Sequence, residues 1–314
     1  MNSEYSIVVP DAETLSCICG ANDSNVRLIE EHLGIPVFAR GNELSIETGD
    51  AALRQEFQFI IDRVSDEVAG GGGSQDVLAS VLNIGRRCGS KSVSIAIPGG
   101  LRTVHPRSFN QAEYIAALRT YDVVFCCGAA GSGKTFLAVA EALRLVLSHQ
   151  RSRLVVSRPV VEAGESLGFL PGDLEQKLGP YLRPLYDAMD ALLPREAARR
   201  LVESGAVEAA PLAYMRGRTL SDSVVILDEA QNATRGQMKM FLTRMGEGSK
   251  VFVTGDPSQV DLPGGIPSGL VHAVKLLSDV PEIGMVRLGA DDGARNPLVK
   301  KIVKAYEHEQ DEAE

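Results

Sequence analysis

An eight-residue run near the middle of the chain has the spacing of a phosphate-binding loop, G-x-x-x-x-G-K-[ST]. It reads Gly128-Ala129-Ala130-Gly131-Ser132-Gly133-Lys134-Thr135. Glycines at these positions let backbone N–H groups turn toward an anion. We expect Lys134 to reach the β- and γ-phosphates of a nucleotide, and Thr135 to bind Mg²⁺ through its hydroxyl. An apolar run at Val123–Cys127 and helical spacing over Phe136–Leu147 supply the strand and helix that this motif requires.

Two carboxylates follow the apolar run Val224–Leu227. In phosphate-binding-loop enzymes, an acidic residue after such a strand holds Mg²⁺ directly or through water, so Asp228 is the second predicted metal-binding residue. Glu229 is placed to polarise the attacking water as a general base. The alternative is a surface pair that only caps the following helix.

A third apolar run, Val251–Thr254, leads into the polar stretch Gly255–Gln259. Because strand ends meet at one edge of a parallel sheet, we expect Asp256 and Gln259 to approach the phosphates. Gln259 is predicted to sense the γ-phosphate and to convert hydrolysis into loop movement. A plain turn around Gly255–Pro257 is the alternative.

Gln111 lies upstream of the phosphate-binding loop, in the stretch Pro106–Tyr114. Its amide offers both a donor and an acceptor, which suits the edge of adenine. This favours ATP as the nucleotide, with Gln111 as the residue that reads the base. A capped surface helix would explain the same stretch without any ligand.

The composition restricts the class of protein. A formal net charge of -9 over 314 residues argues against a protein that coats duplex nucleic acid, although local basic patches remain compatible with it. The five cysteines include no C-x-x-C pair, so neither a disulfide framework nor a zinc site is indicated. The N-terminus has no signal-peptide pattern, and no apolar run reaches the ~20 residues of a membrane span. We therefore expect a soluble, cytoplasmic protein that has no membrane partner.

The order of apolar runs predicts an α/β fold. Strands that alternate with helices indicate a parallel sheet covered on both faces. The predicted strands are Val123–Cys127, Leu154–Val156, Val224–Leu227 and Val251–Thr254. Residues 101–314 are predicted to form this domain. Residues 70–100 are predicted to be a connecting segment that begins with the flexible run Gly70–Gly73 and continues as a helix and a strand at Ser92–Ile97.

Residues 1–69 are predicted to form a small α+β domain. The expected order is strand, helix, strand, strand, helix, with elements at Ser6–Val9, Asn25–Leu33, Val37–Ala39, Leu44–Ile46 and Leu53–Val68. This order resembles a KH-like module, a type that grips single-stranded RNA through a GXXG loop. The corresponding loop, Gly20–Asn25, lacks the second glycine and carries Asp23. RNA binding and a docking or assembly role both remain open for this domain.

The motifs follow one another in the order typical of one family: the phosphate-binding loop, Arg158–Glu165, Leu167–Asp173, Ala210–Thr219, Asp228–Asn232 and Gly255–Pro263. In this order the chain resembles the PhoH-like ATPase family, above all its bacterial members with an added N-terminal domain. The resemblance is strong over about residues 100 to 307 and weak over the first 70. It implies a single RecA-like P-loop NTPase core, related to superfamily 1 helicases, that uses ATP and Mg²⁺.

The same resemblance implies a role in RNA metabolism. Bacterial members are associated with ribosomal RNA maturation and with an endoribonuclease of the YbeY type. The family commonly has an Asp-Val-Val-Arg-His-Pro run near its C-terminus, and here the run reads Asp292-Gly293-Ala294-Arg295-Asn296-Pro297. Arg295 is therefore the candidate for stabilising charge in the transition state.

The related helicases carry two RecA-like cores, and this chain has room for one. An arginine from a facing core is worth ~10³–10⁵ in rate where it operates. We therefore expect a homo-oligomer such as a ring, in which Arg295 or Arg244 acts on the ATP of a neighbour.

Basic and aromatic residues in the family-specific loops are candidate contacts for single-stranded or ribosomal RNA. They are Arg158, Arg216 and Arg218, with Tyr214 as a stacking surface. Ion pairs that close these loops onto the core are the alternative. The favoured function is an ATPase that couples hydrolysis to RNA handling, a description that includes helicase-like unwinding. One rival is a nucleotide-dependent switch that regulates a partner protein without moving along RNA, and another is a kinase.

Overall fold

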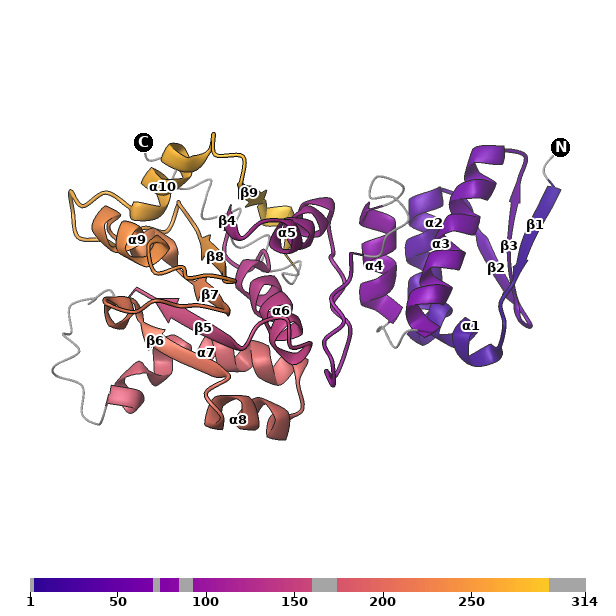
Figure 1. The fold of residues 1–314 in the computed structure, drawn as a ribbon. Helices are drawn as coiled ribbons and strands as arrows, with labels where there is room; N and C mark the ends of the chain where they lie inside the picture. Colours follow the sequence, from indigo (N-terminus) through magenta and orange to yellow (C-terminus); the bar gives the residue numbers. More distant parts are fainter. Residues whose placement is uncertain (1–2, 70–73, 85–92, 160–173, 294–314) are drawn as a thin grey trace. The chain divides into compact units, whose positions relative to one another are not determined.

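The structure is a computed structural model that describes residues 3–69, 74–84, 93–159 and 174–293 (Figure 1). The chain divides into two compact units. One comprises Met1–Ala116 with Met189–Arg199, and the other comprises Ala117–Ala188 with Arg200–Glu314. The predicted flexible run Gly70–Gly73, the family-specific residues 160–173 and the candidate Arg295 lie outside the described residues. The predicted domain limits stay predictions.

The first unit contains an antiparallel sheet of three strands in the order β1-β3-β2. The strands are β1 (Ser3–Val8), β2 (Val37–Arg40) and β3 (Glu43–Thr48). Its helices are α1 (Ala12–Cys19), α2 (Ser24–Leu33), α3 (Ala51–Ala69) and α4 (Ser74–Ile84). Apolar side chains from the sheet and from all four helices share one core, which includes Ile18, Ile29, Leu44, Phe57 and Leu78. The predicted α+β character is confirmed.

The order of elements in this unit differs from the prediction by one helix. The helix α1 was not expected. Over residues 3–69 the observed order is strand, helix, helix, strand, strand, helix. Asp11 caps α1 by accepting a hydrogen bond from the Thr14 N–H at 2.7 Å. The predicted loop Gly20–Asn25 is shorter than expected, because α2 already begins at Ser24 and a 3₁₀ turn fills Ala21–Asp23.

The second unit is built on a six-stranded parallel sheet in the order β6-β5-β7-β8-β4-β9. The strands are β4 (Val123–Gly128), β5 (Arg153–Arg158), β6 (Val207–Pro211), β7 (Ser223–Leu227), β8 (Lys250–Gly255) and β9 (Ile283–Leu288). The four predicted strands are the four in the centre of the sheet. The two strands that were missed, β6 and β9, lie at its edges.

Both faces of this sheet are buried. Phe125, Val225 and Val253 belong to a core that also takes in side chains of α9 (Arg235–Leu242) and α10 (Gly269–Leu277). Their strand neighbours Val124, Ile226 and Phe252 point to the opposite face and are equally buried. The helix α6 (Lys134–Leu147) packs against the strands β4, β5, β7 and β8. This arrangement confirms the predicted RecA-like α/β core.

The remaining helices are α5 (Phe109–Thr120), α7 (Leu174–Leu192) and α8 (Arg195–Glu203). The strand predicted at Ser92–Ile97 was wrong for the described residues, where only an isolated bridge pairs Ile95 with Val104. Within the described ranges, none of the helices combines the length and the apolarity needed to cross a lipid bilayer.

Candidate nucleotide-binding site

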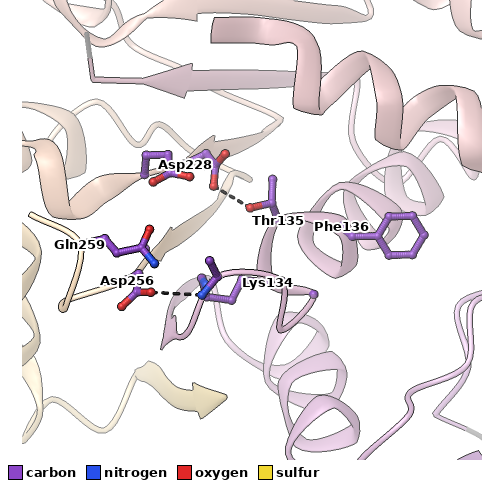
Figure 2. A pocket seen from close by; sticks show the side chains of 11 residues that line it. Lys134, Thr135, Phe136, Asp228, Asp256 and Gln259 are labelled. Carbon is purple, nitrogen blue, oxygen red and sulfur yellow. Dashed lines mark hydrogen bonds between the residues drawn. The ribbon is translucent and has the colours of Figure 1, made fainter. Parts of the chain in front are cut away.

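A cavity of about 350 Å³ opens at the carboxyl ends of β4, β7 and β8. It is lined by Ala130, Gly131, Gly133, Lys134, Thr135, Phe136, Asp228, Glu229, Gly255, Asp256 and Gln259. Three segments far apart in the sequence therefore meet in one site: the loop after β4 and the polar stretches after β7 and β8 (Figure 2). Parallel strands all end on the same side of a sheet, which explains this convergence.

The loop after β4 is shaped to hold an anion. Gly131 and Gly133 have φ values of 74° and 92°, a conformation that glycine adopts without the cost of a Cβ. Lys134 is buried, and its Nζ donates hydrogen bonds to the carbonyls of Gly128 at 2.7 Å and Ala129 at 2.8 Å. The ammonium is thus held inside the loop, at the N-terminus of α6, where a polyphosphate would place its negative charge.

Asp228 is fixed by two hydroxyl groups. Its Oδ1 accepts hydrogen bonds from Thr135 Oγ1 at 2.7 Å and from Thr254 Oγ1 at 2.8 Å. Figure 2 shows Thr135 and Asp228 pointing toward each other, whereas Phe136 points away from them. A carboxylate and a hydroxyl oxygen side by side are the hard oxygen ligands that Mg²⁺ prefers. Sequence reasoning missed Thr254, which is fully buried on β8.

Both carboxylate oxygens of Glu229 have partners. Oε1 lies 3.0 Å from the Arg158 guanidinium, and Oε2 accepts a hydrogen bond from Gln231 Nε2 at 2.6 Å. The backbone of Glu229 is left-handed, with φ 51°, which turns the chain sharply after β7. A non-glycine residue in this conformation is uncommon and often belongs to a functional site.

Asp256 connects the stretch after β8 to the phosphate-binding loop. Its Oδ2 accepts a hydrogen bond from the Ala130 N–H at 3.1 Å. Gln231 Oε1 accepts from the Asp256 N–H at 3.0 Å, so that one buried glutamine joins Glu229 to Asp256. Gln259 lines the same cavity from the exposed part of this loop. The structure thus brings Lys134, Thr135, Asp228, Glu229 and Gln259 to one cavity.

Gln111 lies in the first unit, on α5, and is not among the residues that line the cavity. Its side chain is buried, and its Oε1 accepts a hydrogen bond from the Arg107 N–H at 2.8 Å. The Ser108 hydroxyl accepts from the Gln111 N–H at 3.1 Å, as expected of a helix cap. Adenine recognition by Gln111 stays a prediction.

Besides Arg158, two more of the arginines named from the sequence are bound to their own chain. Arg218 makes a two-pronged ion pair with Glu208, at 2.6 and 2.7 Å. These hydrogen bonds raise the pKa of Arg218 and lower that of Glu208. Arg244 donates to the carbonyls of Met240 and Arg218, both at 3.2 Å. Arg216 is exposed, and so is Tyr214, at 52%.

The segment after β9 returns to the phosphate-binding loop. A Cβ added at Gly293 would lie 2.5 Å from the carbonyl oxygen of Gly131. Gly293 is the last described residue before the candidate Arg295. The start of the C-terminal motif therefore touches the loop, although Arg295 itself lies outside the described residues.

A parallel sheet, a glycine-rich loop around Lys134 and an aspartate fixed beside Thr135 define a P-loop NTPase. A model of the PhoH-like protein family matches residues 103–307, and the chain belongs to this family. A PhoH-like protein of Bacillus subtilis is 42% identical over 315 residues, which cover 95% of each chain. One of Mycobacterium tuberculosis is 43% identical over 296 residues, 92% of this chain and 84% of the relative.

Two further proteins match a smaller part of this chain. Protein PhoH of Escherichia coli is 45% identical over 202 residues, which are 64% of this chain and 57% of the relative. Among solved structures, the large terminase of a thermophilic bacteriophage is 12% identical with a TM-score of 0.38, and the match covers 60% of this chain and 45% of that one.

Proposed function

We propose that this protein binds ATP with Mg²⁺, hydrolyses it, and couples the hydrolysis to the handling of RNA. The observation that carries the proposal is the position of Asp228. Its Oδ1 gathers the hydroxyls of Thr135 and Thr254, next to Glu229 and in the same cavity as Lys134. This arrangement suits a phosphate site, a metal site and a base.

The cavity suits a magnesium nucleotide. Lys134 already lies inside the loop and would exchange its contacts with two backbone carbonyls for phosphate oxygens. Thr135 and Asp228 would hold Mg²⁺, which when bound neutralises phosphate charge and aligns the phosphates. Magnesium is usually held by one or two protein groups together with phosphates and water, and these two residues meet that requirement.

Glu229 is the base in this proposal. Its carboxylate belongs to the wall of the cavity, and it would accept the proton of the water that attacks the γ-phosphate. Gln231 holds one of its oxygens and thereby sets the direction of the side chain. Gln259 is proposed to contact the γ-phosphate and Arg295 to stabilise transition-state charge, either within the chain or on a neighbouring subunit.

The RNA part of the proposal is supported by residues at the carboxyl ends of the strands, the side of the sheet where the cavity also opens. Arg158 ends β5 and pairs in register with Pro211, the last residue of β6. The exposed residues Tyr214 and Arg216 follow β6 within a few positions. Cations next to an exposed aromatic ring suit single-stranded nucleic acid, whose bases stack and whose phosphates need neutralising. A ribosomal RNA substrate and a YbeY-type endoribonuclease partner are the specific forms we propose.

The test is ATP turnover by the purified protein, with and without single-stranded RNA. Lys134→Ala should abolish nucleotide binding. Glu229→Gln should lower kcat by roughly 10²–10⁴ while nucleotide affinity is retained, because only proton transfer is lost. Turnover that survives Glu229→Gln, or a protein that binds no nucleotide, would refute the hydrolysis. Turnover that ignores RNA would refute the coupling.

One observation favours a regulatory switch as a second candidate. The loop that follows Asp256 exposes Val260 and Ile266, at 39% and 43%, and Asn232 holds Asp261 through a pair of hydrogen bonds. Because Asp256 also bonds to the phosphate-binding loop, nucleotide binding would move an exposed apolar surface. A partner protein that binds only the ATP state, together with turnover that RNA does not change, would establish this candidate.

A further inference from the structure

Each oxygen of the carboxylate proposed as the base is engaged by another side chain of the protein. Arg158 engages Glu229 Oε1 at 3.0 Å, and Gln231 engages Oε2 at 2.6 Å. A general base must come within hydrogen-bond reach of the proton that it removes. In this arrangement the two contacts restrain the direction of the Glu229 carboxylate, and loss of one of them would let it turn toward a water molecule.

The two contacts differ in how easily they are released. Gln231 is buried and also accepts a hydrogen bond from the Asp256 N–H, so it is held from both sides. The Arg158 and Glu229 side chains are 23% and 37% exposed, so their ion pair is open to solvent. Exposed ion pairs contribute little to stability, and a second anion can compete for the arginine. Arg158 is therefore the contact that a ligand could remove.

The backbone keeps this pair in place. Arg158 ends β5, and Glu229 follows the neighbouring strand β7 by two positions. The Asp228 N–H donates to the Ser157 carbonyl at 2.9 Å, which extends the pairing of the two strands as far as the ion pair. Release of Glu229 thus needs a rotation of the two side chains and no change in the sheet.

The surroundings of Arg158 indicate the chemistry of the competing anion. In the parallel pair β5–β6, Arg158 lies opposite Pro211, and the chain continues from there to the exposed Tyr214 and Arg216. Arg158, Tyr214 and Arg216 therefore provide a cation, an aromatic ring and a second cation at the carboxyl ends of β5 and β6. A polyanion with stackable bases fits this series better than a small isolated anion does.

We propose that Arg158 is a positioning residue that restrains Glu229, and that a phosphate of single-stranded RNA takes over Arg158 and releases Glu229 toward water. This inference rests on the proposed ATPase function and adds the means by which RNA would stimulate it. Gln231 keeps its hold on Glu229 Oε2 and directs the released carboxylate toward the cavity.

The test compares Arg158→Gln with the unmodified full chain, using single-stranded oligouridylate as the probe. Without RNA, Arg158→Gln should raise kcat for ATP several-fold, toward the RNA-stimulated value of the unmodified protein, and leave KM for ATP unchanged. Added RNA should give no further stimulation. Arg158→Lys should restore the low basal kcat, since an ammonium can also hold the carboxylate. Combining Arg158→Gln with Glu229→Gln should abolish the gain.

Arg153→Gln is the matched control, because Arg153 begins the same strand and its Nε donates to the Ser223 hydroxyl, away from Glu229. It should keep both basal and stimulated turnover. A basal kcat that stays the same or falls in Arg158→Gln, or a stimulation by RNA that persists in it, overturns the inference. Arg158→Met supplies the same comparison if Arg158→Gln does not fold. An unmodified protein without any turnover would instead refute the proposed function.

Discussion

Asp228 Oδ1 accepts hydrogen bonds from two hydroxyls at once, Thr135 at 2.7 Å and Thr254 at 2.8 Å. The first belongs to the phosphate-binding loop and would bind the metal. The second comes from the neighbouring strand β8 and has no access to the cavity, because Thr254 is fully buried. Thr254 would therefore act on the proposed metal site only through Asp228, whose carboxylate it holds in one orientation.

The first prediction concerns this hydroxyl. Thr254→Val keeps the shape of the side chain and removes the donor to Asp228. We expect the Mg²⁺ concentration needed for half-maximal turnover to rise about 10–100-fold, the usual effect of losing a residue that orients a metal ligand. The free energy of unfolding should fall by about 1 kcal/mol. Thr254→Ser retains the hydroxyl and should keep the Mg²⁺ dependence. An unchanged Mg²⁺ titration in Thr254→Val would show that the contact is incidental.

The second prediction concerns the contact between the segment after β9 and the phosphate-binding loop. In Gly293→Ala the new methyl group would lie 2.5 Å from the Gly131 carbonyl oxygen, so that one of the two segments must shift. We expect weaker binding of a fluorescent ATP analogue and a loss of about 1–3 kcal/mol in stability, as for other overpacked sites. Gly289→Ala is the control, because its Cβ would meet no atom nearer than 3.6 Å. Equal nucleotide affinities in the two variants would contradict the prediction.

How far the fold could be predicted depended on how each strand is buried. β4, β5, β7 and β8 are covered on both faces and therefore appear in the sequence as continuous apolar runs. The edge strands β6 and β9 are only partly buried and carry Glu208 and Arg287, so no such run marks them. The helix α1 was missed although Leu15, Ile18 and Cys19 have helical spacing, because the segment is only eight residues long.

In the candidate site, too, some residues could be predicted from local sequence motifs and others could not. The residues of the phosphate-binding loop, Asp228 and Glu229 follow local patterns, and the cavity brings them together. The contacts that hold Asp228 and Glu229 in place come from residues on neighbouring strands and loops, and no local sequence pattern marks them. Thr254 has the β-branched shape of an ordinary core residue, and Gln231, which holds Glu229, bonds to Asp256 25 positions further along the chain. For Arg158 the sequence leaves an RNA contact and an ion pair both open, and its carboxylate partner follows only from the pairing of β5 with β7.

The third prediction concerns the ion pair of Arg218 and Glu208, two residues that flank the exposed Tyr214 and Arg216 in the sequence. The hydrogen bonds from Arg218 hold the pKa of Glu208 below its ordinary value of 4.5. A carboxyl group with a lowered pKa in the folded state stabilises the protein above its unfolded pKa, and this contribution is lost as the pH falls through the folded pKa. Both side chains are about one-third exposed, so the contribution should be no more than about 1 kcal/mol.

Denaturant unfolding at neutral pH and at a pH well below 4.5, where the carboxyl group is protonated in the folded protein as well, checks this. Glu208→Gln should lower stability at neutral pH and should make no difference once the carboxyl group is protonated. A stability difference that stays the same at both pH values would show that the glutamate acts through packing and not through its charge.

The last prediction concerns Lys250, a buried cation at the start of β8 that lies outside the proposed site. Its Nζ donates to the carbonyls of Leu118 at 3.1 Å, Arg119 at 3.2 Å and Tyr121 at 2.6 Å. The last carbonyls of a helix lack partners within the helix and carry partial negative charge, so this ammonium caps the C-terminus of α5. Burial lowers the pKa of Lys250, and the nearby Asp122 opposes that effect.

Lys250→Met preserves the length of the side chain and removes all three donors. Because the carbonyls would then be left inside the protein without partners, we expect the free energy of unfolding to fall by about 2–4 kcal/mol. Lys239→Met is the control, since Lys239 is exposed on α9 and its replacement should change stability by no more than about 0.5 kcal/mol. The free energies of unfolding of both variants, measured with denaturant, test this prediction. If Lys250→Met is as stable as the control, water must satisfy those carbonyls and the cap contributes nothing. A large loss confirms that the sheet and the end of α5 are joined through one buried charge.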